Sequence, residues 1–244
     1  MLLVKKGLKN KNLLWATKGF DPNSGGLLSS MVAEEIGAKT KTAVLSGPTF
    51  AEELAAGKPA AITLATKTID DSVLLAESMS NESLRVYLSS DPVGVQLGGG
   101  LKNIVAIAAG ISDGLEMGAN AKAALVTRGL DEISALGLLL GASEKTFMGL
   151  SGMGDVMLSS SDDKSRNRKL GLSIGGGLSF SEAVKLQSGT PEGAHAIKTL
   201  VENGVVNDKQ PVLYSVYQVL YSGIKPSNVA NGLMRRPIKE EGLR

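Results

Sequence analysis

The sequence predicts an α/β domain with a parallel sheet, followed by a domain that is entirely α-helical. Over roughly the first ninety residues, short apolar runs alternate with stretches of helical periodicity, which is the pattern of strands joined by helices. After residue 95 only helical periodicity remains. The 244 residues are 43% hydrophobic and 20% charged, so the chain can bury one large core or two of ordinary size.

Four short apolar runs are the expected strands, and two helical stripes lie between them. Strands that are buried on both faces have continuous apolar sequences, as these runs have, so we expect a parallel sheet with helices packed on it. The strands are expected at residues 12–17, 42–49, 60–66 and 84–90, and the helices at residues 27–36 and 69–81.

Seven helical patterns make up the rest of the chain. Ser179 and Glu182 have the spacing of a capping box at the start of one of them. We place the domain boundary near Asp91-Pro92, which divides the chain into residues 1–91 and 92–244. The expected helices cover residues 101–112, 120–140, 143–149, 180–187, 193–203, 212–222 and 227–235.

Composition excludes several classes of protein. A net charge of +2, with four Phe, four Tyr and one Trp, offers little of the positive and aromatic surface that binds nucleic acid. Cysteine is absent, so a disulfide framework is excluded and a reducing compartment is the simpler expectation. The opening MLLVKKGLKNKN has no signal-peptide core, and no apolar run approaches a membrane-spanning length of about 20 residues. We therefore expect a cytoplasmic globular protein.

Four polar clusters stand where chemistry is expected. Two follow predicted strands, at the edge where a parallel sheet forms its ligand crevice. The first is Lys18 with Gly19, and the second is Gly47, Thr49 and Ala51. The third is Lys102, which opens the first helix of the α-helical domain. The fourth ends at the start of a later helix and consists of Asp155, Ser165, Arg166, Asn167 and Arg168.

Lys102 is a candidate functional residue because its charge stands in an unfavourable place. In the first turn of a helix its cation works against the positive end of the helix dipole. The alternative is a lysine whose stem covers apolar surface while its ammonium reaches water, which is the commoner case for a lone lysine.

The stretch from Ser165 to Arg168 has the features of an anion site. Free backbone N–H groups at a helix start and the fork of a guanidinium both attract phosphate. Two solvated arginines at a helix end are an alternative of equal weight. Asp155 follows Gly152 and Gly154, and its alternative is an aspartate that stabilises a mobile or tight turn.

The remaining polar features do not form a defensible site. His195 is the only histidine, and without cysteines or a carboxylate cluster it does not make a metal site. A core or surface histidine is expected, and no metal. Gly175, Gly176 and Gly177 lack the phosphate-loop pattern and a preceding strand, so we interpret them as a flexible turn between helices.

Several stretches carry a family resemblance. They are ATKGF, LSGPTFAEELAAGKP, GVQLGGGLKNIVAIAAGISDGLEMGANAKAALVTRGLDEI, SGMGDVMLSSSDDKSRNRKLG and QVLYSGIKP. From about residue 12 onward, and in this order, they resemble bacterial NAD(P)-dependent glycerol-3-phosphate dehydrogenase. The resemblance implies a Rossmann-type, doubly wound parallel sheet followed by an all-α domain. It also implies interconversion of sn-glycerol 3-phosphate and dihydroxyacetone phosphate with NAD or NADP, in supply of glycerophospholipid synthesis.

The resemblance implies a role for each matching residue. Lys102 would accept the proton of the substrate, and burial beside Lys18 and at a helix start would lower its pKa from about 10.4 towards a value useful for this. The substrate would contact Lys18, Gly47, Thr49, Lys102, Asp155, Ser165, Arg166 and Asn167. The cofactor would contact Lys18, Ala51, Arg166, Thr190 and Glu192, although the family commonly has a valine where Thr190 and Pro191 stand.

The family begins with a strand and a Gly-x-Gly-x-x-Gly turn that holds the pyrophosphate, and this sequence has no such strand and turn. We therefore expect a partial Rossmann-type sheet with its first strands missing, and weak binding of NAD(H). One alternative is a truncated, non-catalytic remnant that binds glycerol phosphate weakly or only oligomerises. Another is a related dehydrogenase for a different acidic substrate. The expected partner is a small-molecule substrate, without nucleic acid or a membrane span, and a homodimer is left open.

Overall fold

A computed structural model describes residues 12–36, 41–187, 189–235 and 240. The chain forms two compact units, one from Met1–Gly100 with Gly137–Leu158 and one from Leu101–Leu136 with Ser159–Arg244. Residues 1–11, which hold most of the opening segment in which no signal-peptide core is expected, lie outside the described part. The domain boundary after Asp91 stays a prediction.

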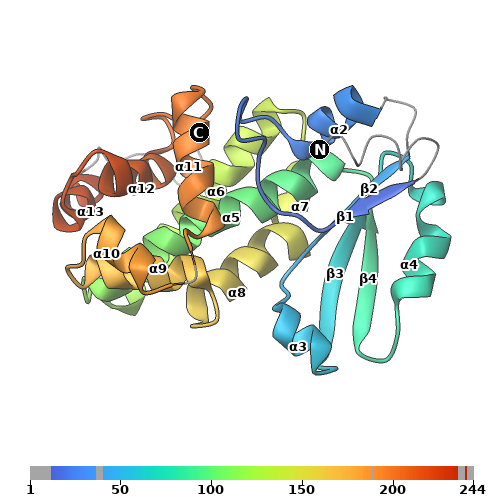
Figure 1. Cartoon of the computed structure of the whole chain (residues 1–244), viewed down its shortest axis with the longest axis horizontal. Helices are drawn as coiled ribbons and strands as arrows, with labels where there is room; N and C mark the ends of the chain where they lie inside the picture. Colours follow the sequence, from blue (N-terminus) through green and yellow to red (C-terminus); the bar gives the residue numbers. More distant parts are fainter. Residues whose placement is uncertain (1–11, 37–40, 188, 236–239, 241–244) are drawn as a thin grey trace. The chain divides into compact units, whose positions relative to one another are not determined.

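The first unit contains a four-stranded sheet in the order β1-β2-β3-β4 (Figure 1). Each expected strand is present, and the α/β fold class is confirmed. β1 pairs with β2 in parallel, and β3 with β4 in parallel, whereas β2 and β3 are antiparallel. The expectation that all strands are parallel is therefore wrong at one pair. The strands are β1 (Leu13–Trp15), β2 (Thr42–Ser46), β3 (Ala60–Ala65) and β4 (Leu84–Ser89).

The reversal at β2 and β3 follows from the connection between them. Residues 47–59 contain α3 (Ala51–Ala55), a helix of 5 residues, as the only helix before β3 begins. At about 1.5 Å per residue this helix is much shorter than a strand that rises about 3.3 Å per residue. It cannot return the chain to the starting edge of the sheet, as a parallel crossover requires. The chain therefore comes back antiparallel, which the apolar pattern alone does not show.

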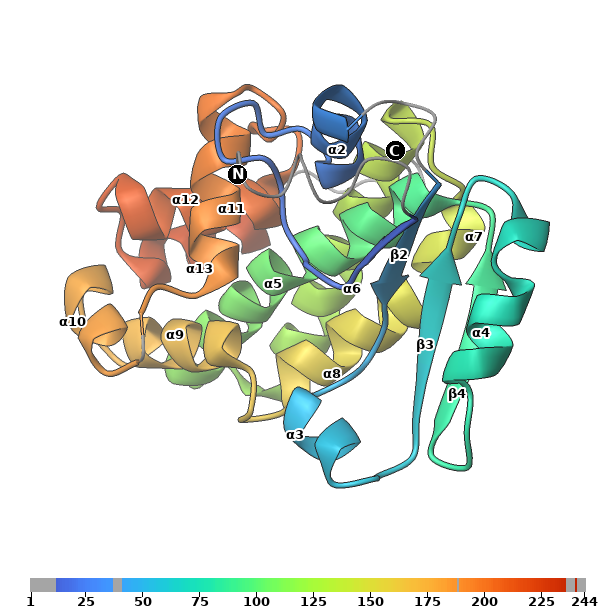
Figure 2. The ribbon, with the colours of Figure 1, turned by 45° about the vertical axis from the view of Figure 1, so that its right-hand side comes forward.

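Apolar residues pack on both faces of the sheet. Ala43 and Leu64 pack in a cluster with Ala76 of α4 (Val73–Met79), which runs beside β4 in Figure 2. On the other face, Val44 and Ala65 share a cluster with Val95. Consecutive residues of a strand point to opposite faces, so one continuous apolar run supplies both clusters.

The helix α5 (Pro92–Gly114) begins nine residues before the expected helix. Asp91 accepts a hydrogen bond from the backbone N–H of Gly94 at 2.8 Å, and proline is well suited to the first helical position. The glycine run that resembles a preceding loop lies inside this helix. A Cβ on Gly98 would lie 2.3 Å from the backbone oxygen of Ser151, so glycine here permits close packing.

By length and composition, α5 could cross a membrane, and its most apolar window is entirely buried inside the protein. The expectation that no apolar run approaches spanning length is therefore corrected for α5. Complete burial of such a helix is typical of a core helix.

Asp91 also holds a second helix in the first unit. Its Oδ2 accepts hydrogen bonds from the backbone N–H of Ser143 at 2.8 Å and from Oγ1 of Thr146 at 2.6 Å. These residues cap and form α7 (Glu144–Phe147). One carboxylate thus joins the starts of two helices that are distant in sequence.

Asp91→Ala is expected to lower the free energy of unfolding by about 2 kcal/mol, because a helix cap and two further hydrogen bonds to a charged group are lost. Urea unfolding measures this change. Asp70→Ala, at an exposed aspartate of the same unit, serves as the control and should change the stability by less than about 0.5 kcal/mol. Equal effects of the two substitutions would contradict the capping role.

Helices make up the described part of the second unit, and each expected helical segment there contains one. The capping box of Ser179 and Glu182 is confirmed at the start of α10. The helices are α6 (Gly118–Leu139), α9 (Arg166–Gly175), α10 (Phe180–Lys185), α11 (Glu192–Glu202), α12 (Pro211–Tyr221) and α13 (Pro226–Met234). In the other unit, α2 (Leu28–Ile36) precedes β2, and the chain enters α8 (Asp155–Ser161) from a π-helical turn (Leu150–Gly154).

In the second unit, α5 and α9 approach each other at backbone distance. A Cβ on Gly110 would lie 2.1 Å from the backbone oxygen of Arg168, and one on Gly171 would lie 2.0 Å from that of Ile107. Glycines are therefore needed on both helices. Beyond α9 the chain turns at Gly177, whose φ of +106° favours glycine, as the interpretation of a turn between helices predicts.

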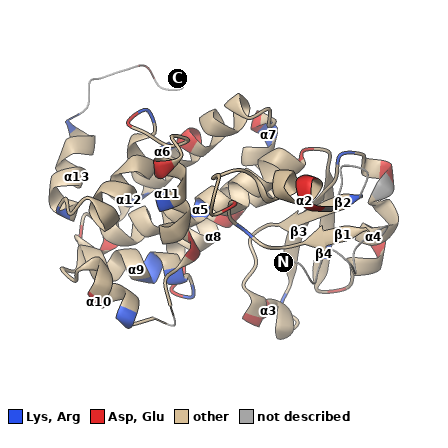
Figure 3. Cartoon of the chain, turned by 45° about the horizontal axis from the view of Figure 1, so that its top comes forward, with Lys and Arg blue, Asp and Glu red and all other residues tan. Residues whose placement is uncertain are grey.

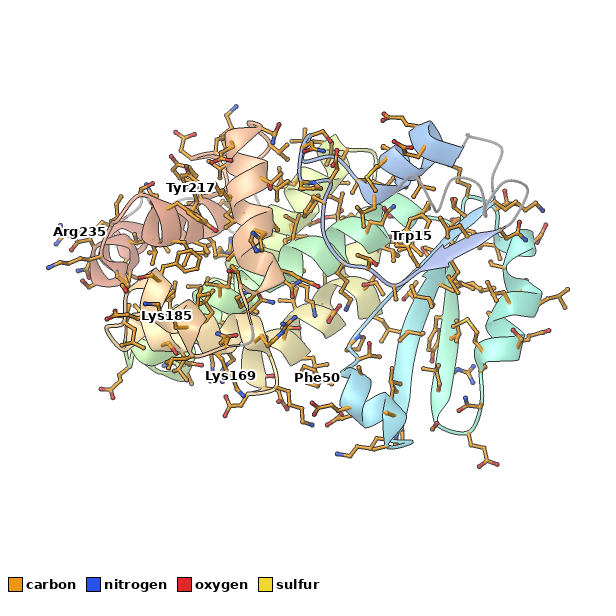
Figure 4. The ribbon with its side chains drawn as sticks, viewed as in Figure 1. Trp15, Phe50, Lys169, Lys185, Tyr217 and Arg235 are labelled. Carbon is orange, nitrogen blue, oxygen red and sulfur yellow. The ribbon has the colours of Figure 1, made fainter. Side chains whose placement is uncertain are left out.

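Tyrosines of α12 connect it to α10 and α11. The ring of Tyr221 packs edge-on against Phe180 at 5.3 Å between centroids, and it lies 5.6 Å from that of Tyr217, which Figure 4 labels. The hydroxyl of Tyr221 donates to the backbone oxygen of Ala194 at 2.9 Å. Burial, with smaller contributions from Glu202 and Tyr217, raises the pKa of Tyr221 to about 12.

Candidate active site

Lys18 and Asp155 form an ion pair in the first unit. Lys18 follows β1 at its carboxyl end, as predicted, and Nζ also donates to the backbone oxygen of Gly47 at 3.2 Å. The side chain of Lys18 is 18% exposed and that of Asp155 is fully buried. A charge pair of this kind, with one partner open to solvent, can hold an ammonium at a fixed place for a polar ligand.

Asp155 does not lie on a mobile loop. It is the first residue of α8, directly after the π-helical turn. In that turn a Cβ on Gly152 would lie 2.2 Å from the backbone oxygen of Phe147, so the glycine permits close packing. Gly152, which makes this stretch resemble a loop, is therefore a packing position.

Gly47, Thr49 and Ala51 follow the carboxyl end of β2, where the sequence places them. A Cβ on Gly47 would lie 3.0 Å from the Cα of Ile62 in β3, which leaves little room for a side chain. Oγ1 of Thr49 donates to the backbone oxygen of Gly47 at 3.4 Å. Ala51 begins α3 and is exposed.

Lys102 lies deep inside α5, ten residues after its start, and is 8% exposed. The prediction that it opens a helix is wrong, because Asp91 and Pro92 start the helix earlier. The helix-dipole argument therefore does not apply to this lysine. Nζ donates to Oγ of Ser159 at 2.7 Å, and both side chains are buried. The solvated-lysine alternative does not fit a residue so enclosed.

Ser159 is a polar residue of this region that the sequence interpretation missed. It stands four residues after Asp155 on α8, which is the spacing of neighbours on one side of a helix. That spacing is a signal present in the sequence. It becomes informative only when Lys102 is seen to contact the serine.

The residues of the predicted anion site at the start of α9 have different contacts. Ser165 caps the helix, since its Oγ accepts from the backbone N–H of Arg168 at 3.3 Å. Arg166 is exposed and has no ion-pair partner among the described residues. Asn167 is buried, and its Oδ1 accepts from the backbone N–H of Gly193 at 3.0 Å. Basic residues gather along α9 and α10 in Figure 3.

Arg168 is occupied within the protein. Its Nε and Nη2 donate to Oδ2 of Asp113 at 3.1 and 2.6 Å, and it forms a second ion pair with Asp163. Burial acts to lower the pKa of this guanidinium, but the hydrogen bonds and charges of Asp113 and Asp163 raise it overall. Arg168 therefore fits neither a phosphate contact nor the alternative of a solvated arginine, because its guanidinium is paired with Asp113 and Asp163.

Asp113 pairs with both Lys122 and Arg168. Burial acts to raise the pKa of its carboxyl, but hydrogen bonds and charges from Lys122 and Arg168 lower it overall. The Nζ of Lys122 lies 3.0 Å from its Oδ1. Because the pKa is lower in the folded state, this carboxylate stabilises the fold above its ordinary pKa of about 3.9 and loses that contribution as the pH falls.

Asp113→Asn is expected to destabilise the protein at neutral pH, and the difference from the wild type should shrink as the pH falls below about 3.9. Urea unfolding at a series of pH values on both sides of that point measures the difference. Asp208→Asn, at an exposed aspartate without a side-chain partner among the described residues, is the control. A difference that stays constant with pH would contradict the role of the charge.

Thr190 and Glu192 flank the start of α11. Pro191 is its N-cap residue, and Oε2 of the exposed Glu192 accepts from Nδ2 of Asn103 at 3.4 Å. His195 is exposed on the same helix, in line with a surface histidine. Across the residues that the structure describes, no group of His, Asp and Glu side chains could hold a metal ion.

Two family models match the chain. The model of the C-terminus of NAD-dependent glycerol-3-phosphate dehydrogenase matches residues 91–231, and the model of its N-terminus matches residues 2–71. The two matches together cover most of the sheet unit and the helical unit.

Relatives with names extend this match. The glycerol-3-phosphate dehydrogenase [NAD(P)+] of Nitrosococcus oceani is 47% identical over 230 residues, which are 94% of this chain and 67% of the relative. That of Bartonella henselae is 44% identical over 237 residues, which are 96% of this chain and 69% of the relative.

Solved structures agree with the sequence matches. The glycerol-3-phosphate dehydrogenase of Coxiella burnetii superposes with a TM-score of 0.88 at 36% identity, over 96% of this chain and 73% of that one. The enzyme of Saccharomyces cerevisiae gives a TM-score of 0.81 at 26% identity, over 94% of this chain and 71% of that one. The chain belongs to the NAD-dependent glycerol-3-phosphate dehydrogenase family.

Proposed function

We propose that the chain interconverts sn-glycerol 3-phosphate and dihydroxyacetone phosphate with NAD or NADP. The observation that carries this proposal is Lys102, a buried amine hydrogen-bonded to Ser159 in the middle of a core helix. Burying a lysine in that place costs free energy, which is expected where the amine has a function. The related proteins are named for this reaction, which needs a group that exchanges a proton with an alcohol.

Lys102 is the proposed acid and base of the reaction. In the direction of oxidation, Nζ accepts the proton of the hydroxyl on carbon 2 while the C–H bond of that carbon breaks and its electron pair leaves as hydride. A carbonyl forms between the carbon and the hydroxyl oxygen. In the reverse direction, the ammonium returns its proton to the oxygen as the carbonyl is reduced. NAD(P)⁺, when bound, supplies the acceptor for the hydride.

The remaining polar residues are proposed to bind and orient the substrate. Arg166 has no ion-pair partner among the described residues, and its guanidinium matches two phosphate oxygens at once. The ammonium of Lys18, held by Asp155, can donate to a substrate oxygen. The proposed substrate contacts are Lys18, Gly47, Thr49, Lys102, Asp155, Ser165, Arg166 and Asn167.

The proposed cofactor contacts fit a dinucleotide in their chemistry. Ala51 is exposed and carries only a methyl group, which permits the close approach of a flat ring or a ribose. The charge of Arg166 suits a phosphate of the cofactor as well as that of the substrate. The full proposed set is Lys18, Ala51, Arg166, Thr190 and Glu192.

The test is the oxidation of NADH or NADPH by the chain with dihydroxyacetone phosphate, followed by absorbance. Turnover with dihydroxyacetone phosphate and a much lower kcat/KM with unphosphorylated dihydroxyacetone is the expected result. Binding of glycerol phosphate without turnover with either cofactor would favour the non-catalytic alternative. Turnover that does not depend on the phosphate would favour a dehydrogenase for another substrate.

We further expect that the protein lies in the cytoplasm and that its product supplies glycerophospholipid synthesis, and we leave a homodimer open. Cell fractionation, lipid labelling in a deletion strain and light scattering, respectively, test them.

A further inference from the structure

The first turn of α11 contacts two other helices of the second unit beside their proposed site residues. The backbone N–H of Gly193 donates to Oδ1 of Asn167, the neighbour of Arg166, at 3.0 Å. One position earlier, Glu192 accepts from Asn103, the neighbour of Lys102, at 3.4 Å. The two asparagines lie on α9 and α5.

The contact with Gly193 fixes the orientation of the Asn167 carboxamide. Gly193 is the second residue of α11, so its N–H has no partner within the helix. Pro191, the N-cap residue, makes no side-chain cap hydrogen bond, and Asn167 supplies this acceptor from another helix. A backbone N–H can only donate, so the oxygen of the carboxamide must face it. Nδ2, which has no partner among the described residues, then points away from Gly193 with both of its protons.

Only glycine fits at position 193. A Cβ there would lie 2.7 Å from Oδ1 of Asn167 and 2.7 Å from the backbone oxygen of Asn103. Both distances are far shorter than an ordinary van der Waals contact, so any other residue would separate the N–H from its acceptor. The glycine is therefore a requirement of the contact.

We propose that Gly193 is a positioning residue for anion recognition. Its N–H fixes the oxygen of the Asn167 side chain against α11, so that Asn167 turns its Nδ2 donors away from α11. A carboxamide held in this way favours an oxyanion over a ligand group that can only donate. If the Asn167 carboxamide were turned by 180°, its oxygen would face the phosphate and repel it. This inference rests on the proposed function for the identity of the ligand, the phosphate end of sn-glycerol 3-phosphate.

Amide hydrogen exchange tests the contact without any ligand. In Asn167→Ala the exchange of the Gly193 amide should quicken by about tenfold, as loss of one hydrogen bond predicts. The Ala194 amide is the internal control, because it donates to the backbone oxygen of Pro191 at 3.1 Å and should keep its rate. An unchanged rate at Gly193, or equal changes at both amides, would overturn the proposal.

Calorimetric titration with sn-glycerol 3-phosphate tests the consequence. Gly193→Ala and Asn167→Ala should each weaken binding by about tenfold. The double variant should lose less than the sum of the two single losses, because part of the effect of Gly193→Ala acts through Asn167 and only the contact of its Cβ with the backbone oxygen of Asn103 is independent of it. Asn167→Asp should bind more weakly than Asn167→Ala, since its second oxygen would face the phosphate. Gly232→Ala is the control, because a Cβ there meets no atom within 4 Å.

The outcomes separate this inference from the proposed function. Additive losses in the double variant would show that the glycine has a general structural role, and would overturn the inference while leaving the function standing. A wild-type chain that does not bind sn-glycerol 3-phosphate would contradict the proposed function. The exchange experiment still decides the contact in that case, and it does not depend on the folding of Gly193→Ala.

Discussion

Lys102→Ala is expected to lower kcat by about two to four orders of magnitude, the usual contribution of a general acid or base. The amine is buried against Ser159, and its removal takes away the group that is proposed to exchange a proton with the substrate. Lys102→Arg should not restore activity, because a guanidinium does not release its proton at ordinary pH. Steady-state kinetics with dihydroxyacetone phosphate and NADH measures both variants.

Lys185→Ala is the control for this experiment. Lys185 is exposed at the end of α10 (Figure 4), and its removal should leave kcat unchanged. Near-normal turnover of the Lys102→Arg variant would contradict proton transfer and would indicate that the position needs only a charge. Thermal unfolding of each variant shows whether a loss of activity is a loss of fold.

Arg166→Ala is expected to weaken the binding of sn-glycerol 3-phosphate by about 3 kcal/mol, which is roughly a hundredfold in Kd. Arg166→Lys should cost about 2 kcal/mol, because the charge stays and the paired donors of the fork are lost. Calorimetry measures both values. The basis is that Arg166 is exposed at the start of α9 without an ion-pair partner among the described residues.

Lys169→Ala tests whether net positive charge alone explains such a loss. Lys169 is an exposed lysine on the same helix, and its removal should change binding by less than about 0.5 kcal/mol. A loss of equal size for Lys169→Ala would indicate a diffuse electrostatic effect. Unchanged binding in Arg166→Ala would exclude the phosphate contact.

Much of the fold follows from local pattern. The strands are short apolar runs bounded by Gly, Pro and Ser, and the helical unit shows the three-and-four spacing of apolar residues throughout, so both were predictable. The direction of β3 could not be predicted in this way. It depends on the length of the helix between β2 and β3, which has five residues. The start of α5 was missed for a related reason. Glycines that usually end a helix are tolerated in its interior where another backbone packs against them.

The candidate site divides in the same way. The ends of β1 and β2 were predictable, because a sheet presents its polar residues there. The different roles of Arg166 and Arg168 could not be predicted. Asp113 stands 55 residues from Arg168 in the chain, and only the fold brings the two side chains together. Ser159 and Gly193 were missed for the same reason. Each is an ordinary residue until its partner is known.

The fate of the hydrogen on carbon 2 shows whether the chain transfers a hydride to the cofactor. The chain is incubated with sn-glycerol 3-phosphate that carries deuterium on carbon 2, with NAD⁺ or NADP⁺, and the reduced cofactor is analysed by mass spectrometry. We predict that the deuterium is found on the nicotinamide ring, and that Lys102→Ala forms almost none of this product. Reduced cofactor without deuterium, or the same yield from Lys102→Ala, would contradict hydride transfer assisted by Lys102.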